Sequence, residues 1–557
     1  MSGILEARNR IAELMAEAIK KAKESGKLPD VNIPEVPLEH PQVPSYGDYA
    51  SSLPLRLGRL MRKSPVEIAE TILFMLPTSP EISKASVAAP GFINFTLSDE
   101  WLTGQVDSII SDGDDYGRLQ LGHGEKMQLE FVSGNPTGPL HVGHGRGAVL
   151  GSTLAEVLRL VGYDVKTEYY INDAGSQIAN FGRSIYARHC QTLGVDKEMP
   201  EGGYFGDYVK DLAREIVADE GRLLLSSPEE EALARITEIA VRRMLDRIKS
   251  DLKLLGVEFD VWFSESTLYS SGQFDNVMKI LGEKGYLISR EGAIWFTSSS
   301  LGEDKDNVLI RSDGQPTYFA SDIAYHYNKF VERGFDEVID IWGADHQGHV
   351  SRMKAAVAAL GIDPDRLTII ITQMVTLYRN NEIVRLSKRT GDIITLKELI
   401  DEVGADACRL FFLSRAADSQ MDFDLELAKE QSSENPVYYI QYAHTRTCGV
   451  LRYAKGKGIT FDDGDTSLLT SESELDLIKK MVLLPEVIEA AAKTLEPHHL
   501  VYYAIDLATV FHSFYKQCRI ISEDSKLTKA RLKLVTAAKI VLGKTLALMG
   551  LNAPETM

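Results

Sequence analysis

The chain has 557 residues, and its 44% of hydrophobic and 25% of charged residues are ordinary for a globular protein, which excludes a fibrous or wholly disordered chain. At roughly 150 residues per domain, this length predicts three or four domains. The formal net charge of −19 argues against an indiscriminate nucleic-acid binder, because phosphate binding depends on clustered lysine and arginine.

Residues 1–115 predict an N-terminal α+β domain. Its expected elements are helices at 4–24, 49–61 and 65–76 and a hairpin at 84–97, where apolar residues alternate around a Pro-Gly turn. Five prolines between residues 29 and 44 exclude a continuous helix there. The Gly- and Asp-rich stretch 111–126 is the expected linker to the next domain.

Residues 120–400 predict a Rossmann-like domain. A strand at 127–134, a Gly/Pro turn, a helix at 141–163 and a strand at 164–173 form a βαβ unit, which implies a parallel, doubly wound sheet. A mostly charged, helical stretch at about 183–300 is expected to be an insertion. The strands expected to complete the interrupted sheet are those at 307–311, 337–342 and 367–375.

After residue 405 we expect no further strands. The remaining segments have helical period, so residues 405–557 predict an all-α helical bundle. The predicted fold is therefore multidomain α/β, with an interrupted Rossmann-like parallel sheet between an N-terminal α+β domain and a C-terminal helical bundle.

The first motif that carries chemistry is His141-Val142-Gly143-His144, at the junction of the first strand and its helix. Such a junction directs backbone N–H groups and the positive end of a helix dipole at a bound phosphate. The alternative is that the two histidines only flank a helix cap. Zinc is a weaker alternative, because no third or fourth ligand follows at a usable spacing.

The second motif is the basic loop Arg385-Leu386-Ser387-Lys388-Arg389. A lysine in such a loop can reach polyphosphate as a point charge, and Gly391 allows the loop to change conformation. Basic solvated loops are common, so the motif is informative only together with HVGH in the same α/β domain.

HVGH and RLSKR resemble the HIGH and KMSKS motifs of the class I aminoacyl-tRNA synthetases, with Arg385 in place of the leading lysine of KMSKS. Four longer segments, EFVSGNPTGPLHVGHGRGAVLG, YYINDAGSQIANFG, DACRLFFLS and NPVYYIQYAHTRTCGVLR, are similar to arginyl-tRNA synthetases in particular. SYGDYASSLPLRL and PGFINFTL resemble the N-terminal domain of that family, so the resemblance covers essentially the whole chain.

The resemblance implies ATP-dependent activation of L-arginine to arginyl-adenylate, followed by transfer to the 3′-terminal ribose of tRNA(Arg). His141 and His144 would bind the ATP phosphates, and Gly143 would let the adenine approach the backbone. Lys388 and Arg385 would bind the leaving pyrophosphate. The residues expected to contact ATP elsewhere are Ser387, Gly343, Asp345 and His346, and ATP would enter together with Mg²⁺.

The amino acid should be selected by charge, because a guanidinium pairs best with a carboxylate that can bind it in bidentate fashion. Asp322, with Tyr318 four residues earlier on the same helical face, matches positions that the family uses for arginine. Glu130, Asn135 and Gln347 match other substrate-binding positions, and Asp173 and Gln177 are expected neighbours. The alternative for Asp322 is a salt bridge on a helix surface.

Three basic segments could contact tRNA despite the net charge. Residues 516–544 contain eight lysines and arginines against two acids, and residues 441–457 and 49–66 each contain four with no acid. Basic helices are usually only solvated faces, but these segments lie in the two domains that the family uses for tRNA.

Two rival functions remain. A cysteine-specific relative would need clustered cysteines for a zinc site, whereas Cys190, Cys408, Cys448 and Cys518 are scattered. A catalytically silent tRNA-binding paralogue is disfavoured by the histidine pair and Lys388, although Arg385 departs from the motif. We expect a monomer of the cytoplasm with no structural zinc and no membrane partner.

Overall fold

Five parallel strands form the central sheet in the computed structural model, which describes residues 3–384 and 394–557. The strand order is β11-β10-β4-β5-β6. The bounds are β4 (Lys126–Glu130), β5 (Asp164–Ile171), β6 (Val261–Ser264), β10 (Glu337–Gly343) and β11 (Leu367–Thr372). The chain builds outward from β4 to β5 and β6 and then returns to the other side of β4, so the strand order reverses between β4 and β10. Ligands of open parallel sheets bind at such a reversal.

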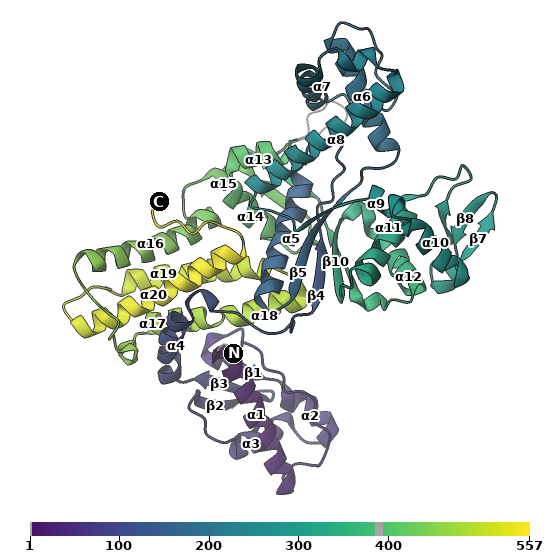
Figure 1. Ribbon diagram of the computed structural model, residues 1–557. Helices are drawn as coiled ribbons and strands as arrows, with labels where there is room; N and C mark the ends of the chain where they lie inside the picture. The colour runs from purple at the N-terminus through teal and green to yellow at the C-terminus, as the bar shows by residue number, and fades with distance from the viewer. Residues whose placement is uncertain (1–2, 385–393) are drawn as a thin grey trace.

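The helix that follows β4 is deeply buried. In α5 (Val142–Leu160), 14 of the 19 residues are buried, because the sheet covers one face and the C-terminal helices cover another (Figure 1). Gly151 is required by this packing, since a Cβ atom there would lie 2.2 Å from the Phe131 ring.

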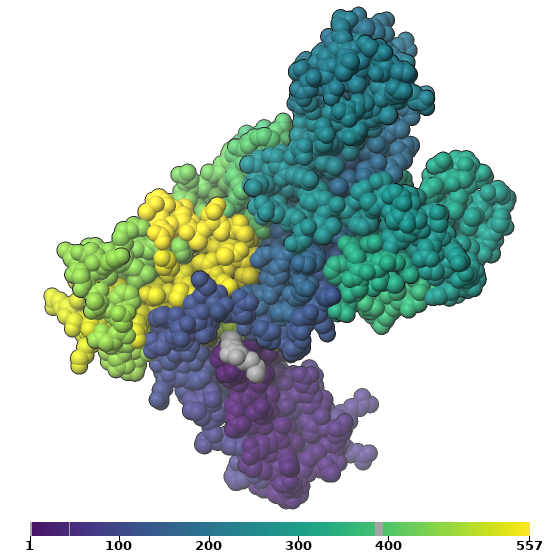
Figure 2. Space-filling model, viewed as in Figure 1, coloured from purple at the N-terminus to yellow at the C-terminus, as the bar shows by residue number. Residues whose placement is uncertain are grey.

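The segment predicted as an insertion is only partly one. Helices α6 (Ser176–Thr192), α7 (Asp207–Glu220) and α8 (Glu229–Leu254) project as a separate lobe (Figures 1 and 2). The same segment, however, supplies β6 to the central sheet, where it pairs with β5. A four-residue strand is too short to stand out among charged helices, so its place in the sheet could not be predicted.

A separate sheet, which is antiparallel, follows β6 in the sequence and has the strand order β7-β8-β9. Its strands are β7 (Leu287–Arg290), β8 (Ala293–Phe296) and β9 (Asn307–Ile310), and the helices around it are α9 (Ser266–Ser270), α10 (Gln273–Glu283), α11 (Tyr318–Tyr327) and α12 (Val350–Leu360). The prediction that 307–311 completes the central sheet is therefore wrong, because β9 pairs with β8.

The N-terminal domain packs helices on a three-stranded sheet of order β1-β3-β2. Its elements are α1 (Gly3–Glu24), β1 (Tyr49–Ser51), α2 (Leu53–Met61), α3 (Pro65–Met75), β2 (Ile82–Ala88), β3 (Phe92–Leu97) and α4 (Asp99–Asp112). The helix predicted from residue 49 begins at Leu53 instead, because Pro54 favours the first helical turn and Tyr49 pairs with Phe95 in the sheet.

The C-terminal part is helical apart from one strand. Its helices are α13 (Leu396–Val403), α14 (Ala405–Leu413), α15 (Leu425–Lys429), α16 (Pro436–Gly456), α17 (Glu472–Val482), α18 (Leu484–Thr494), α19 (His498–Gln517) and α20 (Ser525–Leu548). The prediction that strands stop at residue 405 is wrong, because β14 (Met421–Asp424) pairs with β12 (Val375–Arg379), which also pairs with β13 (Glu382–Ile383).

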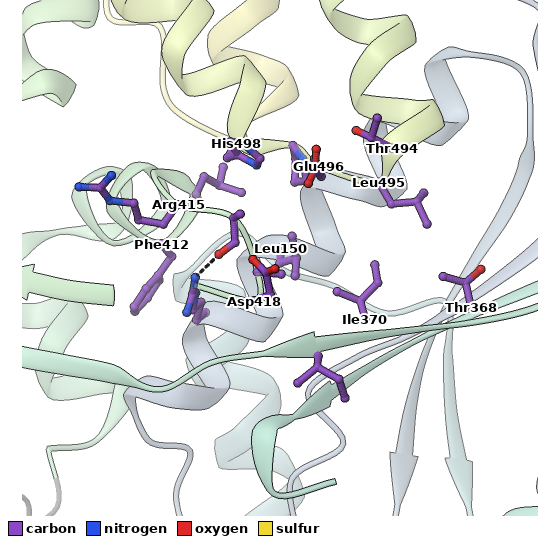
Figure 3. A pocket seen from close by; sticks show the side chains of 16 residues that line it. Leu150, Thr368, Ile370, Phe412, Arg415, Asp418, Thr494, Leu495, Glu496 and His498 are labelled. Carbon is purple, nitrogen blue, oxygen red and sulfur yellow. Dashed lines mark hydrogen bonds between the residues drawn. The ribbon is translucent and has the colours of Figure 1, made fainter. Parts of the chain in front are cut away.

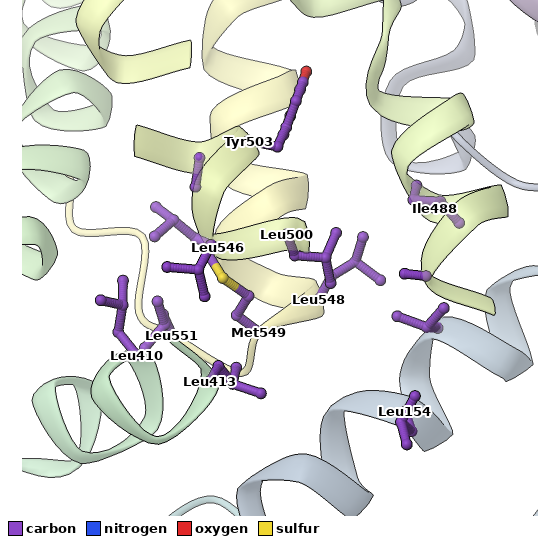
Figure 4. Close-up of a cluster of buried hydrophobic side chains, with 14 of the residues drawn as sticks. Leu154, Leu410, Leu413, Ile488, Leu500, Tyr503, Leu546, Leu548, Met549 and Leu551 are labelled. Carbon is purple, nitrogen blue, oxygen red and sulfur yellow. The ribbon is translucent and has the colours of Figure 1, made fainter. Parts of the chain in front are cut away.

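The helical bundle and the Rossmann-like domain share one apolar core. Figure 4 shows Leu154 of α5, Ile488 of α18, Leu413 of α14 and Leu500 of α19 in one cluster of buried side chains. All four side chains are buried to 1% exposure or less, and burying each such side chain contributes roughly 1.5 to 3 kcal/mol. The bundle is therefore fixed against the helix that begins with HVGH.

Among the described residues, no helix has both the length and the apolar surface needed to cross a bilayer.

Candidate active site

Most of the described residues predicted for the site lie at the carboxyl ends of β4 and β10. Glu130 is the last residue of β4, and His141 caps the helix that follows. Gly343 ends β10, and a 3₁₀ turn from Ala344 to His349 carries Asp345, His346 and Gln347. The two groups therefore flank the point where the strand order reverses, which is the expected place for a nucleotide.

The HVGH turn is ordered by its own histidines. His141 Nδ1 accepts a hydrogen bond from the Gly143 N–H at 3.2 Å, and His144 Nδ1 accepts one from the His141 N–H at 3.2 Å. A neutral imidazole whose Nδ1 accepts carries its proton on Nε2. Burial, together with the neighbouring His141, lowers the pKa of His144 to about 3, so this ring is neutral near pH 7 and offers an Nε2–H donor.

Glycines allow this turn to form. The two imidazole rings lie 3.9 Å apart, and a Cβ atom at Gly143 would lie 3.1 Å from the His141 ring. At Gly145, a Cβ atom would lie 2.7 Å from Leu396. The start of α5 is thus packed closely against the start of α13.

The described chain that follows the RLSKR motif lies beside the same turn. Arg385, Ser387 and Lys388 lie outside the described residues. After the loop, His141 and Thr395 form an antiparallel bridge, and the Leu396 N–H donates to the Leu140 carbonyl at 2.8 Å. The start of α13 is therefore joined by backbone contacts to the HVGH turn.

The predicted guanidinium-binding residues lie on α11. Tyr318 is the first residue of this helix and is 49% exposed, and the Asp322 side chain is partly buried. No described residue donates a hydrogen bond or forms a salt bridge to the Asp322 carboxylate, so the salt bridge considered as the alternative is not formed within the described residues. Burial, with added repulsion from Glu130 and Glu265, raises the pKa of Asp322 to about 7 although His326 opposes the shift.

Glu130 belongs to a buried ion network that the sequence analysis missed. Lys329 Nζ lies 2.6 Å from Glu130 Oε2 and 2.7 Å from Asp340 Oδ1. His326 Nε2 lies 2.8 Å from Asp340 Oδ2. Asp322, His326 and Lys329 are spaced by four and three residues, which places them on one helical face. This spacing was the signal in the sequence that could have revealed the network.

A second missed carboxylate is Glu265. It follows β6 directly, is 4% exposed, and has a pKa that burial raises.

The residues expected to neighbour the substrate, Asp173 and Gln177, have partners within the protein. Asp173 accepts hydrogen bonds from Ser264 Oγ at 2.5 Å and the Ser266 N–H at 3.1 Å. Gln177 accepts one from the Asn135 amide at 2.9 Å, which links the turn after β4 to α6.

Three family models match successive parts of the chain. Residues 9–97 match the arginyl tRNA synthetase N-terminal domain, residues 105–442 match the catalytic domain of class I (R) tRNA synthetases, and residues 440–557 match the DALR anticodon binding domain. The chain belongs to the arginyl-tRNA synthetases. The family and the multidomain α/β fold predicted from the motifs are confirmed. Membership makes the chain a class I arginine–tRNA ligase that uses ATP.

Known relatives resemble the whole chain. An arginine–tRNA ligase of Dehalococcoides mccartyi is 56% identical over 557 residues, which is all of both chains. A crystal structure of a putative arginyl-tRNA synthetase from Campylobacter jejuni is 35% identical, with a TM-score of 0.77 over 83% of this chain and 100% of that one. The Thermus thermophilus arginyl-tRNA synthetase structure is 22% identical, with a TM-score of 0.75 over 99% and 100% of the two chains, and it supports the fold alone.

A cavity of about 230 Å³ lies away from these synthetase motifs, between α5, β11 and the turn that joins α18 to α19 (Figure 3). Arg146 lines it, but its guanidinium donates to the carbonyls of Ala416, Ser419 and Gln373 at 2.7 to 2.9 Å. None of the residues predicted for ATP or arginine lines this cavity. Arg146 therefore anchors α5 to the C-terminal part of the chain.

Near the same turn, Glu496, His498 and His499 have donor atoms within 4.8 Å of one another, and among the described residues they are the one group whose spacing could suit a metal ion. The group lies outside the predicted ATP and arginine sites.

Many cations of the segment 516–544 have partners within the protein. Lys529 pairs with Asp463 at 2.7 Å, and Arg531 pairs with the buried Glu474 at 2.6 Å. Lys533 pairs with Asp107 of α4 at 2.8 Å. These cations contribute less to an RNA-binding surface than their number in the sequence indicates.

Exposed aromatic residues lie on α16 and α19. The Arg446 guanidinium lies 4.4 Å from the centre of the Tyr442 ring and 4.9 Å from that of Tyr515, and Tyr453 is 57% exposed. Such side chains can stack on unpaired bases, as an anticodon-binding domain requires.

Proposed function

We propose that arginine and ATP react at the carboxyl edge of the sheet between β4 and β10, and that the arginyl group then passes to the 3′-terminal ribose of tRNA(Arg). One observation carries this proposal: a histidine-capped helix N-terminus meets Thr395, which follows the RLSKR motif in the sequence, at the point where the strand order reverses. Both features suit a polyphosphate.

For adenylation, His141 and His144 donate from Nε2 to the phosphates, and Lys388 with Arg385 binds the pyrophosphate as it leaves. Gly143 allows the nucleotide to lie close to the backbone. The other ATP contacts are Ser387, Gly343, Asp345 and His346. Catalysis here is mainly positioning and electrostatic stabilisation, since the reaction needs no covalent enzyme intermediate. Mg²⁺ enters bound to ATP and supplies charge neutralisation at the phosphate oxygens.

For arginine, Asp322 accepts hydrogen bonds from the guanidinium while Tyr318 covers it. Two features support this role: the Asp322 carboxylate has no partner within residues 3–384 and 394–557, and acidic residues surround it, which favours a cation over a neutral side chain. Glu130, Asn135 and Gln347 bind the remaining polar groups of the substrate. Glu265 adds a second buried carboxylate close to Asp322.

We also propose that the domains extend over residues 1–115, 120–400 and 405–557, with tRNA contacts in the first and the last. The chain is a monomer, acts in the cytoplasm, and needs no structural zinc.

Aminoacylation of tRNA with each of the twenty amino acids tests the function. We expect charging with arginine alone. A chain that binds tRNA(Arg) but charges nothing would instead be the catalytically silent paralogue. Charging with another amino acid would refute the pocket assigned to arginine. The variant Asp322→Asn serves as the comparison with the wild type, since it should weaken arginine binding without weakening tRNA binding.

A further inference from the structure

Lys329 is an unusual lysine because it is completely buried, with 0% of its surface exposed. It lies in a π-helical turn, Asn328–Glu332, that follows α11 directly. Turns of this kind are rare and occur frequently at functional sites. A buried lysine is costly unless its charge is compensated, and here Glu130 and Asp340 lie 2.6 and 2.7 Å from its Nζ atom.

Lys329 also joins three parts of the site. Glu130 ends β4, Asp340 lies in β10, and Lys329 follows the helix that carries Asp322. The strand pairing places Glu130 and Asp340 directly opposite each other. Two carboxylates so close would repel one another, and a single ammonium group between them removes that repulsion.

We propose that Lys329 is a positioning residue for arginine recognition, which holds Glu130 ionised and correctly oriented for the cationic substrate. This inference rests on the proposed function, in which Glu130 contacts arginine. Lys329 occupies Oε2 of Glu130 and Ser133 donates to Oε1 at 2.8 Å. Since a carboxylate has about four lone-pair sites, Glu130 can still accept a hydrogen bond from the substrate while it is fixed by these two donors.

The charges around Glu130 explain why Lys329 is needed. Burial raises the pKa of Glu130 and the nearby Asp340 adds to this rise, whereas Lys329 opposes it. Asp322 of α11 is a further acid close enough to Glu130 to repel it, and Tyr170 and Tyr325 also interact with it electrostatically. Lys329 is thus the one cation among the described residues that contacts Glu130, so its loss should raise the pKa of Glu130 further and favour the protonated form.

The same turn provides a matched control. Arg333, four residues after Lys329, pairs with the buried Glu168 of β5, and its Nη2 lies 2.9 Å from Glu168 Oε1. No hydrogen bond or salt bridge joins Arg333 to Glu130. Replacing Arg333, which directly follows the π-helical turn, therefore removes a partly buried ion pair without changing the partner of Glu130.

The test measures KM for arginine and for ATP in Lys329→Met, Arg333→Met, Glu130→Gln and the double variant Glu130→Gln/Lys329→Met. We expect Lys329→Met to raise the arginine KM about tenfold or more, with kcat and the ATP KM within about threefold of wild type. In the Glu130→Gln background, Lys329→Met should add less than about threefold, because Lys329 acts through Glu130. The ratio of the Lys329→Met to the wild-type arginine KM should fall as pH rises, since a higher pH favours the ionised form of Glu130 even without the ammonium group.

Three results would overturn the proposal: effects of Glu130→Gln and Lys329→Met that multiply in the double variant, equal changes in the KM for ATP and arginine, or an Arg333→Met variant with the same pH profile. If Lys329→Met does not fold, Lys329→Gln keeps hydrogen-bond donors and tests the same coupling. If Glu130→Gln changes the arginine KM but Lys329→Met does not, the positioning role of Lys329 is refuted, whereas the proposed contact of Glu130 with arginine is retained. If neither variant changes it, the proposed role of Glu130 fails as well.

Discussion

The replacement Asp322→Asn tests the arginine pocket most directly, because it keeps the size of the side chain and removes its charge. The pKa of Asp322 is about 7, so about half of the free enzyme carries a protonated Asp322 at pH 7. Only the ionised form pairs well with a guanidinium. The wild-type arginine KM should therefore fall about tenfold between pH 6 and pH 8, because the binding-competent fraction rises by that factor.

Asp322→Asn should remove this pH dependence. It should also raise the arginine KM at pH 8 roughly 30-fold or more, which corresponds to a loss of about 2 to 5 kcal/mol of binding free energy. The assay is aminoacylation over a pH series, with the ATP KM as internal reference. Asp345→Asn is the control, because it removes a carboxylate predicted to contact ATP and should affect the ATP KM instead. An Asp322→Asn enzyme that keeps the tenfold pH dependence would refute the assignment of this titration to Asp322.

The same replacement should stabilise the free enzyme. The pKa of this carboxyl group rises from 3.8 to about 7 on folding. The group therefore lowers the free energy of unfolding of the protein as pH rises through that interval, and the loss is complete above pH 7. Three pKa units correspond to about 4 kcal/mol as an upper bound, which solvent contact of the partly exposed group reduces. Thermal unfolding at pH 8 without arginine should show a higher Tm for Asp322→Asn than for wild type, and at pH 4 the difference should vanish.

Lys388→Ala should lower kcat about 100-fold, as expected for one electrostatic contact to a developing charge, with little change in the arginine KM; an unchanged kcat in aminoacylation would remove Lys388 from the mechanism. Arg409→Met should destabilise the fold by about 2 to 4 kcal/mol in urea unfolding, because it leaves the buried carbonyls of Met549 and Leu255 without their donor; a wild-type midpoint would contradict this. Arginine-dependent exchange of pyrophosphate into ATP should rise about tenfold or more when tRNA is added, and full exchange without tRNA would exclude this coupling.

Local patterns predicted the parts of the fold that depend on local sequence. The βαβ unit around HVGH and the helices after residue 405 follow from hydrophobic periods of two and 3.6 residues. Pairing between strands that are distant in the sequence was harder to predict. β6 and β9 are both short strands of four residues, and nothing in their sequences indicates that the first joins the central sheet and the second does not.

The site shows the same division. Residues within motifs, such as His141 and His144, could be predicted because their spacing has a physical reason. Glu265 could not be assigned, because an acid on its own has no signal in the sequence, whereas for Lys329 the one signal was its spacing from Asp322 and His326. Their roles depend on burial and on contacts between distant parts of the chain, such as that of Lys329 with Glu130, 199 residues away.

The segment 516–544 shows why a count of charges can mislead. Its cations were expected to bind tRNA because few acids lie near them in the sequence. In the folded chain, Lys533 reaches Asp107 of α4 and Arg531 reaches Glu474 of α17, whose side chain is 1% exposed. An exposed cation can leave a surface partner for a phosphate at little cost, since such pairs contribute about 1 kcal/mol or less. Arg531 cannot, because the departure of its guanidinium would leave Glu474 charged, buried and unpaired. RNA contacts in this segment should therefore fall on Lys516, Arg519 and Lys526, which are exposed, while Arg531 and Lys533 join the bundle to itself and to the N-terminal half of the chain.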